Sequence, residues 1–185
     1  MSPIGFLIVV NLIMYLATSV RPELFINLFG FHPASFLERP WTIVTNLFIH
    51  APFPSIGHIF ANMLTLYFFG SYLTKLIGER NFLIVYFLGG ILGNVFYLFL
   101  APPFSIAVGA SGAIFAVGGA LTVMRPKLTV FIFPIPAPIP LWVAVIGGFL
   151  IMSFLPFIAW QAHLGGLLVG LVAGFSFRTR ERRFF

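Results

Sequence analysis

Six long apolar segments, separated by short polar or proline-rich breaks, account for most of the chain. A transmembrane helix needs about 20 consecutive, mostly apolar residues. The fourth segment ends where Arg125, Pro126 and Lys127 bring in charge and a helix-breaking proline, and the fifth segment is short. The pattern predicts an all-α membrane protein with six transmembrane helices, at residues 3–20, 56–77, 82–100, 108–124, 141–155 and 161–177.

The connections between these segments differ in character. Residues 21–54 mix charged and apolar positions, which predicts a long interfacial, partly helical loop with Trp41 at headgroup depth. Residues 78–81 predict a tight turn, and alternating prolines over residues 134–140 predict an extended entry into the fifth helix. Because the sequence contains no internal repeat and no sign of a second domain, we expect residues 1–185 to form one domain.

Composition restricts the chemistry as well as the fold. Of the 185 residues 60% are hydrophobic and 8% are charged, with a mean hydropathy of +1.08, whereas a soluble domain has about 25% charged residues. The chain has no cysteine and no aspartate, which excludes a thiol nucleophile, an aspartyl dyad and a Ser-His-Asp triad. A proton-coupled transporter is disfavoured, because all the glutamates lie outside the apolar segments.

The basic residues are distributed unevenly between the two sides of the predicted bundle. When the connections alternate between sides, one side receives only Arg21 and Arg39. Lysine and arginine mark the cytoplasmic side of membrane proteins, so we expect a multi-pass protein of a prokaryotic cell membrane with both termini in the cytoplasm. The same rule explains the net charge of +6 without a nucleic-acid partner. The other side receives Lys75, Arg80, Arg125, Lys127, Arg178, Arg180, Arg182 and Arg183.

Under this topology the second, fourth and sixth helices all enter the membrane from the outer face. Each has polar residues within its first one or two turns: His58 and Asn62 in the second, Ser111 in the fourth and His163 in the sixth. A single polar residue of this kind is also explained by an interhelical hydrogen bond. Three helices with polar residues at the same depth instead predict a shared site.

The residue types at that depth suit acyl transfer. Serine needs a base before it can act as a nucleophile, and histidine is the usual base, so Ser111 and His163 form a candidate catalytic dyad. His58 and Asn62 are four residues apart on one helix face, and both offer hydrogen-bond donors for an oxyanion. Phe115 lies one turn below Ser111, where its ring either packs against the imidazole or fills space at lipid level.

Small residues surround the candidate nucleophile. Gly109 and Gly112 flank it closely, and their lack of side chains lets another backbone approach the hydroxyl. Clusters of small residues also occur where membrane helices simply pack closely. Neither a zinc-binding His-Glu-x-x-His pattern nor a phosphate-binding glycine loop with lysine is present, so we expect no metal and no cofactor.

Taken together, these motifs resemble the rhomboid family of intramembrane serine proteases over nearly the whole chain. The resemblance implies a minimal six-helix rhomboid-like core with a Ser111 nucleophile and a His163 base. It also implies oxyanion stabilisation by His58 and Asn62. The matching motifs are His58-x-x-x-Asn62, Gly109-x-Ser111-Gly112, and Ala162-His163-x-x-Gly166-x-x-x-Gly170, in which Gly166 and Gly170 would let the sixth helix lie against the fourth.

Three positions depart from the family pattern. Phe115 stands where the family often has tyrosine, and Thr74 where it often has glutamate. The loop motif of the family is reduced to Arg39-Pro40-Trp41. The first change removes a hydroxyl but keeps the ring, and the other two lie away from the dyad.

The sequence therefore predicts a serine endopeptidase that cleaves transmembrane helices of membrane-protein substrates near the outer face of the bilayer. By resemblance, small residues near the cut would be favoured. The alternative is a catalytically silent relative that binds membrane helices as an escort or quality-control module, and a small transporter is a distant third. Retention of both Ser111 and His163 favours the protease. The sequence specifies neither the substrate nor the oligomeric state.

Overall fold

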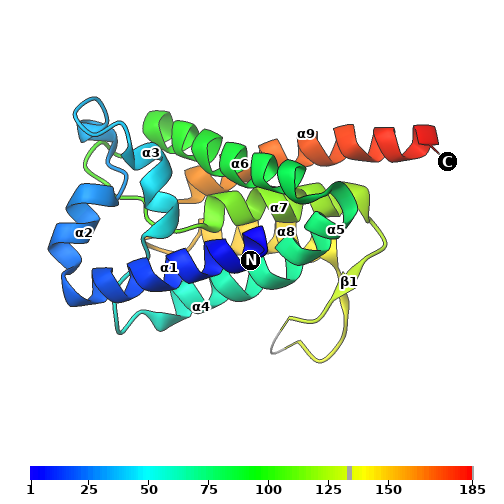
Figure 1. The fold of residues 1–185 in the computed structure, drawn as a ribbon, viewed down its shortest axis with the longest axis horizontal. Coiled ribbons are helices and arrows are strands. Elements are labelled where there is room, and N and C mark those ends of the chain that lie inside the picture. The colour runs from blue at the N-terminus through cyan, green and yellow to red at the C-terminus, as the bar shows by residue number, and fades with distance from the viewer. Residues whose placement is uncertain (133–134, 185) are drawn as a thin grey trace.

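The computed structural model describes residues 1–132 and 135–184, with side chains described as far as Thr179. Helices make up most of this part of the chain (Figure 1). In order, the elements are α1 (Pro3–Val20), α2 (Pro22–Phe29), the 3-10 turn η1 (Pro33–Ser35), α3 (Thr42–Thr45), the 3-10 turn η2 (Asn46–Phe48), α4 (Ile56–Thr65), the π-helical turn η3 (Leu66–Gly70), α5 (Ser71–Ile77), α6 (Glu79–Leu100), α7 (Ser111–Met124), β1 (Thr129–Val130), β2 (Ile139–Pro140), α8 (Leu141–Ser153) and α9 (Trp160–Phe184).

Three of the described helices are long and apolar enough to cross a membrane: α1, α6 and the segment Trp160–Thr179 of α9. Helices α7 and α8 are apolar but contain only 14 and 13 residues. At 1.5 Å per residue each is about 20 Å long, shorter than a hydrocarbon core of about 30 Å. A helical membrane protein is therefore confirmed, whereas six crossings stay a prediction.

Several boundaries differ from the expected ones. The turn before α6 is made by Gly78 alone, with φ of 80°, so the expected turn at residues 78–81 is wrong and Glu79 already lies in the first helical turn. There its carboxylate faces the positive end of the helix dipole. Helix α7 starts at Ser111 rather than at residue 108, because Gly109 adopts a φ of 119° that a helix does not allow. Helix α9 continues through the basic tail to Phe184.

The connection between α7 and α8 is a short β-hairpin, an element that the prediction of an all-α membrane fold did not include. Thr129 lies opposite Pro140, and Val130 lies opposite Ile139, in antiparallel register. The predicted extended entry into the fifth helix is present over Ile139–Pro140. Pro134, the first proline of the alternating run, lies outside the described residues.

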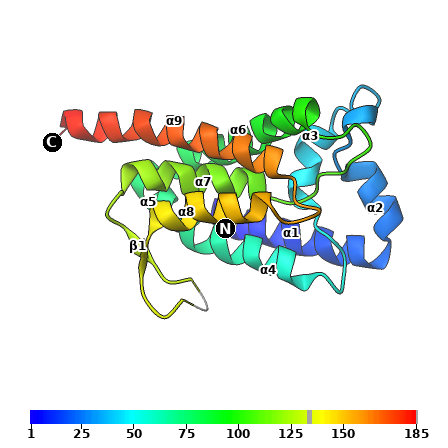
Figure 2. The same cartoon turned by 180° about the vertical axis from the view of Figure 1, so that it is seen from behind.

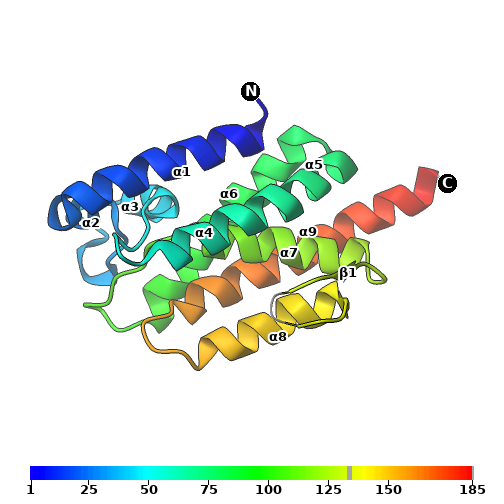
Figure 3. The ribbon, with the colours of Figure 1, turned by 90° about the horizontal axis from the view of Figure 1, so that it is seen from below.

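Helix α7 occupies the centre of the bundle, and nearly all its side chains are buried (Figure 3). On one side the backbone of α9 lies directly against it. A Cβ atom added at Gly166 would lie 2.0 Å from the carbonyl oxygen of Gly112, and one at Gly170 would lie 2.1 Å from that of Ala116. Glycine is needed at these positions because the two backbones meet with no space for a side chain. Helix α8 packs against another side of α7 (Figure 2).

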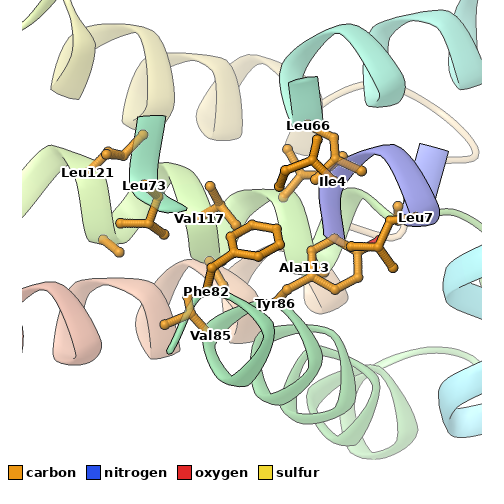
Figure 4. Packing of buried hydrophobic residues seen from close by; sticks show 14 of the residues in the cluster. Ile4, Leu7, Leu66, Leu73, Phe82, Val85, Tyr86, Ala113, Val117 and Leu121 are labelled. Atoms are coloured by element: carbon orange, nitrogen blue, oxygen red, sulfur yellow. The ribbon is translucent and has the colours of Figure 1, made fainter. Parts of the chain in front are cut away.

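The main hydrophobic core joins α1, the segment from α4 to α5, α6 and α7 (Figure 4). Phe82 and Tyr86 of α6 are completely buried in it, and their rings contact each other at a centroid distance of 6.0 Å. The labelled partners from the other helices are Ile4, Leu7, Leu66, Leu73, Ala113, Val117 and Leu121.

The long loop between α1 and α4 is partly helical, as predicted, and it covers the end of the bundle where α7 begins (Figure 1). Backbone hydrogen bonds between Phe31 and Ala107, of 3.0 and 2.9 Å, join this loop to the segment that precedes α7. Trp41 is half exposed, and its indole nitrogen donates to the Leu28 carbonyl oxygen at 2.9 Å. The loop is therefore a fixed part of the wall around the start of α7.

Candidate active site

Ser111 is placed by the sharp turn that precedes α7. The Gly109 amide donates to the carbonyl oxygen of Asn46 at 3.0 Å, which ties this turn to the long loop. Gly109 has a φ of 119°, a conformation that side-chain-bearing residues rarely adopt. A Cβ at this position would also lie 2.7 Å from Nε2 of His58. Gly109 therefore serves two purposes, because it turns the chain into α7 and lets His58 approach the turn.

His163 lies in the first turn of α9, and its side chain meets Ser111. The Ser111 Oγ and the His163 Nε2 are 2.7 Å apart, a hydrogen-bond distance, and the histidine is 3% exposed. The contact between α7 and α9 sets this distance. Gly166 lies one turn after His163 on α9, and Gly112 directly follows Ser111 on α7. These two glycines touch, so the closest approach of the two backbones lies beside the dyad.

Phe115 packs against the imidazole, as one of the two sequence interpretations proposed. The ring centroids of Phe115 and His163 are 4.7 Å apart, with 32° between the ring planes. Phe149 of α8 supports Phe115 from another side through an edge contact at 6.1 Å. Within the described residues Nδ1 of His163 has no hydrogen-bond partner. Ring packing, rather than a carboxylate, therefore orients this histidine.

His58 and Asn62 lie on α4 but differ in how close they come to the dyad. A Cβ atom added at Gly109 would lie within 4 Å of both His58 Nε2 and Ser111 Oγ. His58 is therefore a neighbour of the nucleophile. Asn62 is 6% exposed, and its amide nitrogen donates to the backbone oxygen of His58 at 2.8 Å. No hydrogen bond joins Asn62 to Ser111 or His163 among the described residues. The bond to His58 uses one of the two hydrogens on this amide nitrogen.

The start of α7 supplies a further set of donors. Ala110 precedes the helix, and no described side chain caps it. The backbone N–H groups of a first helical turn have no partner within the helix. Those that follow Ser111 therefore lie beside the hydroxyl and can donate to an oxygen that develops negative charge there.

Two asparagines that the sequence analysis did not select hold the back of the site. Asn46 and Asn94 are each 2% exposed and bind each other through both amides, at 3.1 and 2.7 Å. Asn94 also donates to the Ile43 carbonyl oxygen at 2.7 Å, while the Asn46 carbonyl oxygen accepts the Gly109 amide. The pair thus connects α6 with the turn that presents Ser111. Asn94 could have been selected from the sequence, because it is a polar residue inside the apolar segment 82–100.

His50, near the end of the long loop, is a further residue beside the site. It is fully buried, and its ring contacts that of His58 at a centroid distance of 4.9 Å in a T-shaped arrangement. Burial, and secondly the charge of His58, lowers the pKa of His50 to about 3. His50 is therefore neutral at physiological pH and supports the His58 ring by packing.

A small cavity lies behind Ser111, and the described residues contain no metal-binding arrangement. The space beside Ser111 that is lined by Asn46, Asn94 and Ala162 has a volume of about 10 Å³. This is room for about one water molecule. No group of three His, Cys, Asp or Glu side chains that could bind a metal exists within the described residues.

Ser111 and His163 are in hydrogen-bond contact at the start of the buried helix α7. Comparison with known proteins shows the family. The model of the rhomboid domain matches residues 37–180. This chain belongs to the rhomboid family. It is 31% identical over 166 residues to rhomboid protein 1, mitochondrial, of Saccharomyces cerevisiae, with 77% of this chain and 44% of that protein covered.

Other relatives differ in what their names say about activity. The chain is 30% identical over 146 residues to the putative rhomboid protease YdcA of Bacillus subtilis, with 78% of this chain and 71% of that protein covered. It is also 33% identical over 130 residues to inactive RHOMBOID-like protein 8 of Arabidopsis thaliana, with 69% of this chain and 35% of that protein covered. The chain spans about half the length of the first relatives it matches, 44% and 49%.

Of the three departures from the usual rhomboid pattern, Phe115 packs against His163, whereas the loop segment and Thr74 lie away from the dyad. A guanidinium nitrogen of Arg39 donates to the Asn27 carbonyl oxygen, so the Arg39-Pro40-Trp41 segment is fastened to α2 rather than to the site. The hydroxyl of Thr74 in α5 is buried without a hydrogen-bond partner among the described residues. Neither residue contacts Ser111 or His163 through a hydrogen bond in the described part of the chain.

Proposed function

We propose that this rhomboid is an intramembrane serine endopeptidase in which Ser111 is the nucleophile and His163 the general base. The observation that supports the proposal most directly is the 2.7 Å distance between Ser111 Oγ and His163 Nε2. A base must lie within hydrogen-bond reach of the proton that it removes. Contact with Phe115 and burial of the ring hold the imidazole in that position.

The reaction begins when Nε2 of His163 takes the Ser111 hydroxyl proton as Oγ attacks the scissile carbonyl carbon. The resulting oxyanion accepts hydrogen bonds from first-turn amides of α7, from His58 and from the remaining amide hydrogen of Asn62. Protonated His163 then gives its proton to the leaving amine, and an acyl-enzyme on Ser111 remains. Water, deprotonated by His163, attacks the ester and releases the new carboxylate.

The proposed substrates are transmembrane helices, and the lipid bilayer is the other partner. We propose that α1, the segment α4–α5, α6, α7, α8 and α9 all cross the bilayer, with both termini in the cytoplasm and Ser111 near the outer face. The uneven distribution of basic residues supports this orientation. Relatives from yeast mitochondria and from a bacterium show that the family is not confined to prokaryotic cell membranes. Neither a nucleic acid nor a metal has a part in the proposal.

A catalytically silent role in binding membrane helices is the second candidate function. An Arabidopsis relative whose name describes it as inactive supports this candidate. The contact between Ser111 and His163 favours the protease, because a silent protein has no need to keep both groups in reach of each other.

Cleavage of a generic transmembrane substrate by the purified protein in detergent, together with labelling by a fluorophosphonate probe, tests the proposal. Ser111→Ala and His163→Ala should each reduce cleavage to background, because residues that act as a unit are not additive. Asn62→Ala should retain measurable cleavage, with a loss of at most about 10²–10³, since other donors remain. Ser176→Ala is the matched control, because this serine is exposed and its one hydrogen bond within the described residues goes to the Val172 carbonyl oxygen.

Wild-type protein that is folded but neither cleaves nor reacts with the probe would contradict the protease and support the silent candidate. Equal labelling of wild type and Ser111→Ala would show that another serine reacts. Loss of labelling in Ser176→Ala would have the same meaning.

A further inference from the structure

A second pocket lies at the opposite end of α7 from Ser111. Its volume is about 310 Å³, and it lies between α5 and the turn that links α7 to β1. Because α7 has 14 residues, this pocket lies about 20 Å along the helix from the dyad. Its size reaches the lower end of the range for ligand pockets, about 300–1,000 Å³. The lining residues are Tyr72, Met124, Arg125, Pro126, Lys127 and Leu128.

The lining combines positive charge with apolar surface. Arg125 and Lys127 supply two cations, and Tyr72 supplies a phenol, while no acidic residue among those whose side chains are described lines the pocket. Arg125 donates to the carbonyl oxygen of Met124 at 3.0 Å, which holds the guanidinium near the end of α7. Guanidinium, ammonium and hydroxyl donors are the groups that bind phosphate oxygens in proteins. The charge and the donors therefore fit a phosphate group.

The hairpin beside the pocket exposes apolar side chains that can lie at the bilayer surface. Residues 128–140 contain no charged side chain, and three of its described apolar residues, Phe131, Ile132 and Ile135, are 76%, 39% and 43% exposed. Figure 1 shows the hairpin around β1 at the opposite end of the bundle from α2 and α3. Pairing of β1 with β2 satisfies part of its backbone, and its prolines have no N–H group that would need a partner in lipid.

From this juxtaposition we propose that the pocket binds the phosphate of an anionic phospholipid in the leaflet opposite to the dyad. The phosphate contacts Arg125, Lys127 and the Tyr72 hydroxyl, and the acyl chains lie along the apolar side chains of the hairpin. A soluble phosphate would meet the same donors but would gain nothing from the exposed apolar hairpin. Basic pockets between transmembrane helices on the cytoplasmic side are a recurring type of anionic lipid site. The proposal depends on membrane insertion and is independent of catalysis by Ser111.

The absence of cysteine allows a direct binding measurement. Thr129 is exposed on β1 beside the pocket, so Thr129→Cys gives one attachment point for a fluorophore. The labelled protein is reconstituted in phosphatidylcholine vesicles in which brominated phosphatidylglycerol or brominated phosphatidylcholine quenches the fluorophore. The relative binding constant of the two lipids is then measured for each variant. Thermal unfolding of each variant in the same detergent reports whether it is folded.

We expect preferential quenching by phosphatidylglycerol, and a loss of about fivefold in this preference for Lys127→Gln or Arg125→Gln. Arg80→Gln removes the same charge from the same side without touching the pocket, so it should keep the preference. Because Lys127 is exposed, its variant decides the test if Arg125→Gln fails to fold. Equal quenching by both lipids, or an equal loss in Arg80→Gln, would overturn the proposal. If added inorganic phosphate abolished the preferential quenching by brominated phosphatidylglycerol, the pocket would be assigned to a soluble anion instead.

Discussion

Replacement of Gly166 by alanine tests how the α7–α9 contact controls the dyad. The added Cβ would lie 2.0 Å from the Gly112 carbonyl oxygen and 2.8 Å from its carbon, and both are backbone atoms that cannot rotate away. The two helices must part by about 1 Å or more before this contact becomes ordinary. His163 lies one turn before Gly166 on the same helix, so the displacement moves its Nε2 away from Ser111.

The expected loss of activity is larger than the loss of stability. Overpacking costs about 1–3 kcal/mol in the free energy of unfolding. Alanine regains up to about 1 kcal/mol through its higher helix propensity. A displacement of about 1 Å between reacting groups can reduce turnover about 100-fold. Ser111 Oγ and His163 Nε2 are 2.7 Å apart, so a shift of about 1 Å takes them out of hydrogen-bond distance.

The assay compares initial rates of transmembrane-substrate cleavage and thermal unfolding in the same detergent. Gly148→Ala on α8 is the matched control, because a Cβ at Gly148 meets no atom within 4 Å. It should leave both the rate and the melting temperature close to those of wild type. The reasoning would be refuted if Gly166→Ala kept wild-type cleavage, or if Gly148→Ala lost as much.

Three further predictions test the support around the site and the orientation of the chain. Phe115→Tyr should retain cleavage, whereas Phe115→Ala should reduce turnover through loss of the ring against the imidazole; equal rates for wild type and alanine would refute this. Asn94→Leu should slow fluorophosphonate labelling and lower the melting temperature, since it leaves the Asn46 amide buried without its partner. Unchanged labelling would show that the turn before Ser111 does not depend on the pair. Reporter fusions after Gly78 and at the C-terminus should be cytoplasmic and one near Ala34 external; an external C-terminus would contradict the orientation.

The sequence by itself determined the helical membrane character and the residues at the candidate site. Length and hydropathy are local properties, so α1 was predicted with its observed boundaries. Polar residues are costly inside apolar segments, which made Ser111 and His163 visible without a structure. The contact of Phe115 with the imidazole was one of the two interpretations that the sequence left open, because residues four apart share a helix face. The turn before α6 was misplaced, because the conformation of Gly78 alone ended the preceding helix.

The tertiary structure decided how these residues are held. The Asn46–Asn94 pair joins residues 48 positions apart, and no local pattern relates a loop amide to one in a helix. The direction of the Asn62 amide also depends on its surroundings, and in the structure it binds its own helix rather than the dyad. Gly166 was expected at a helix contact, but only the fold shows that it meets a backbone carbonyl beside Ser111. Sequence patterns select residue types and depths, whereas distances between helices arise only when their faces pack together.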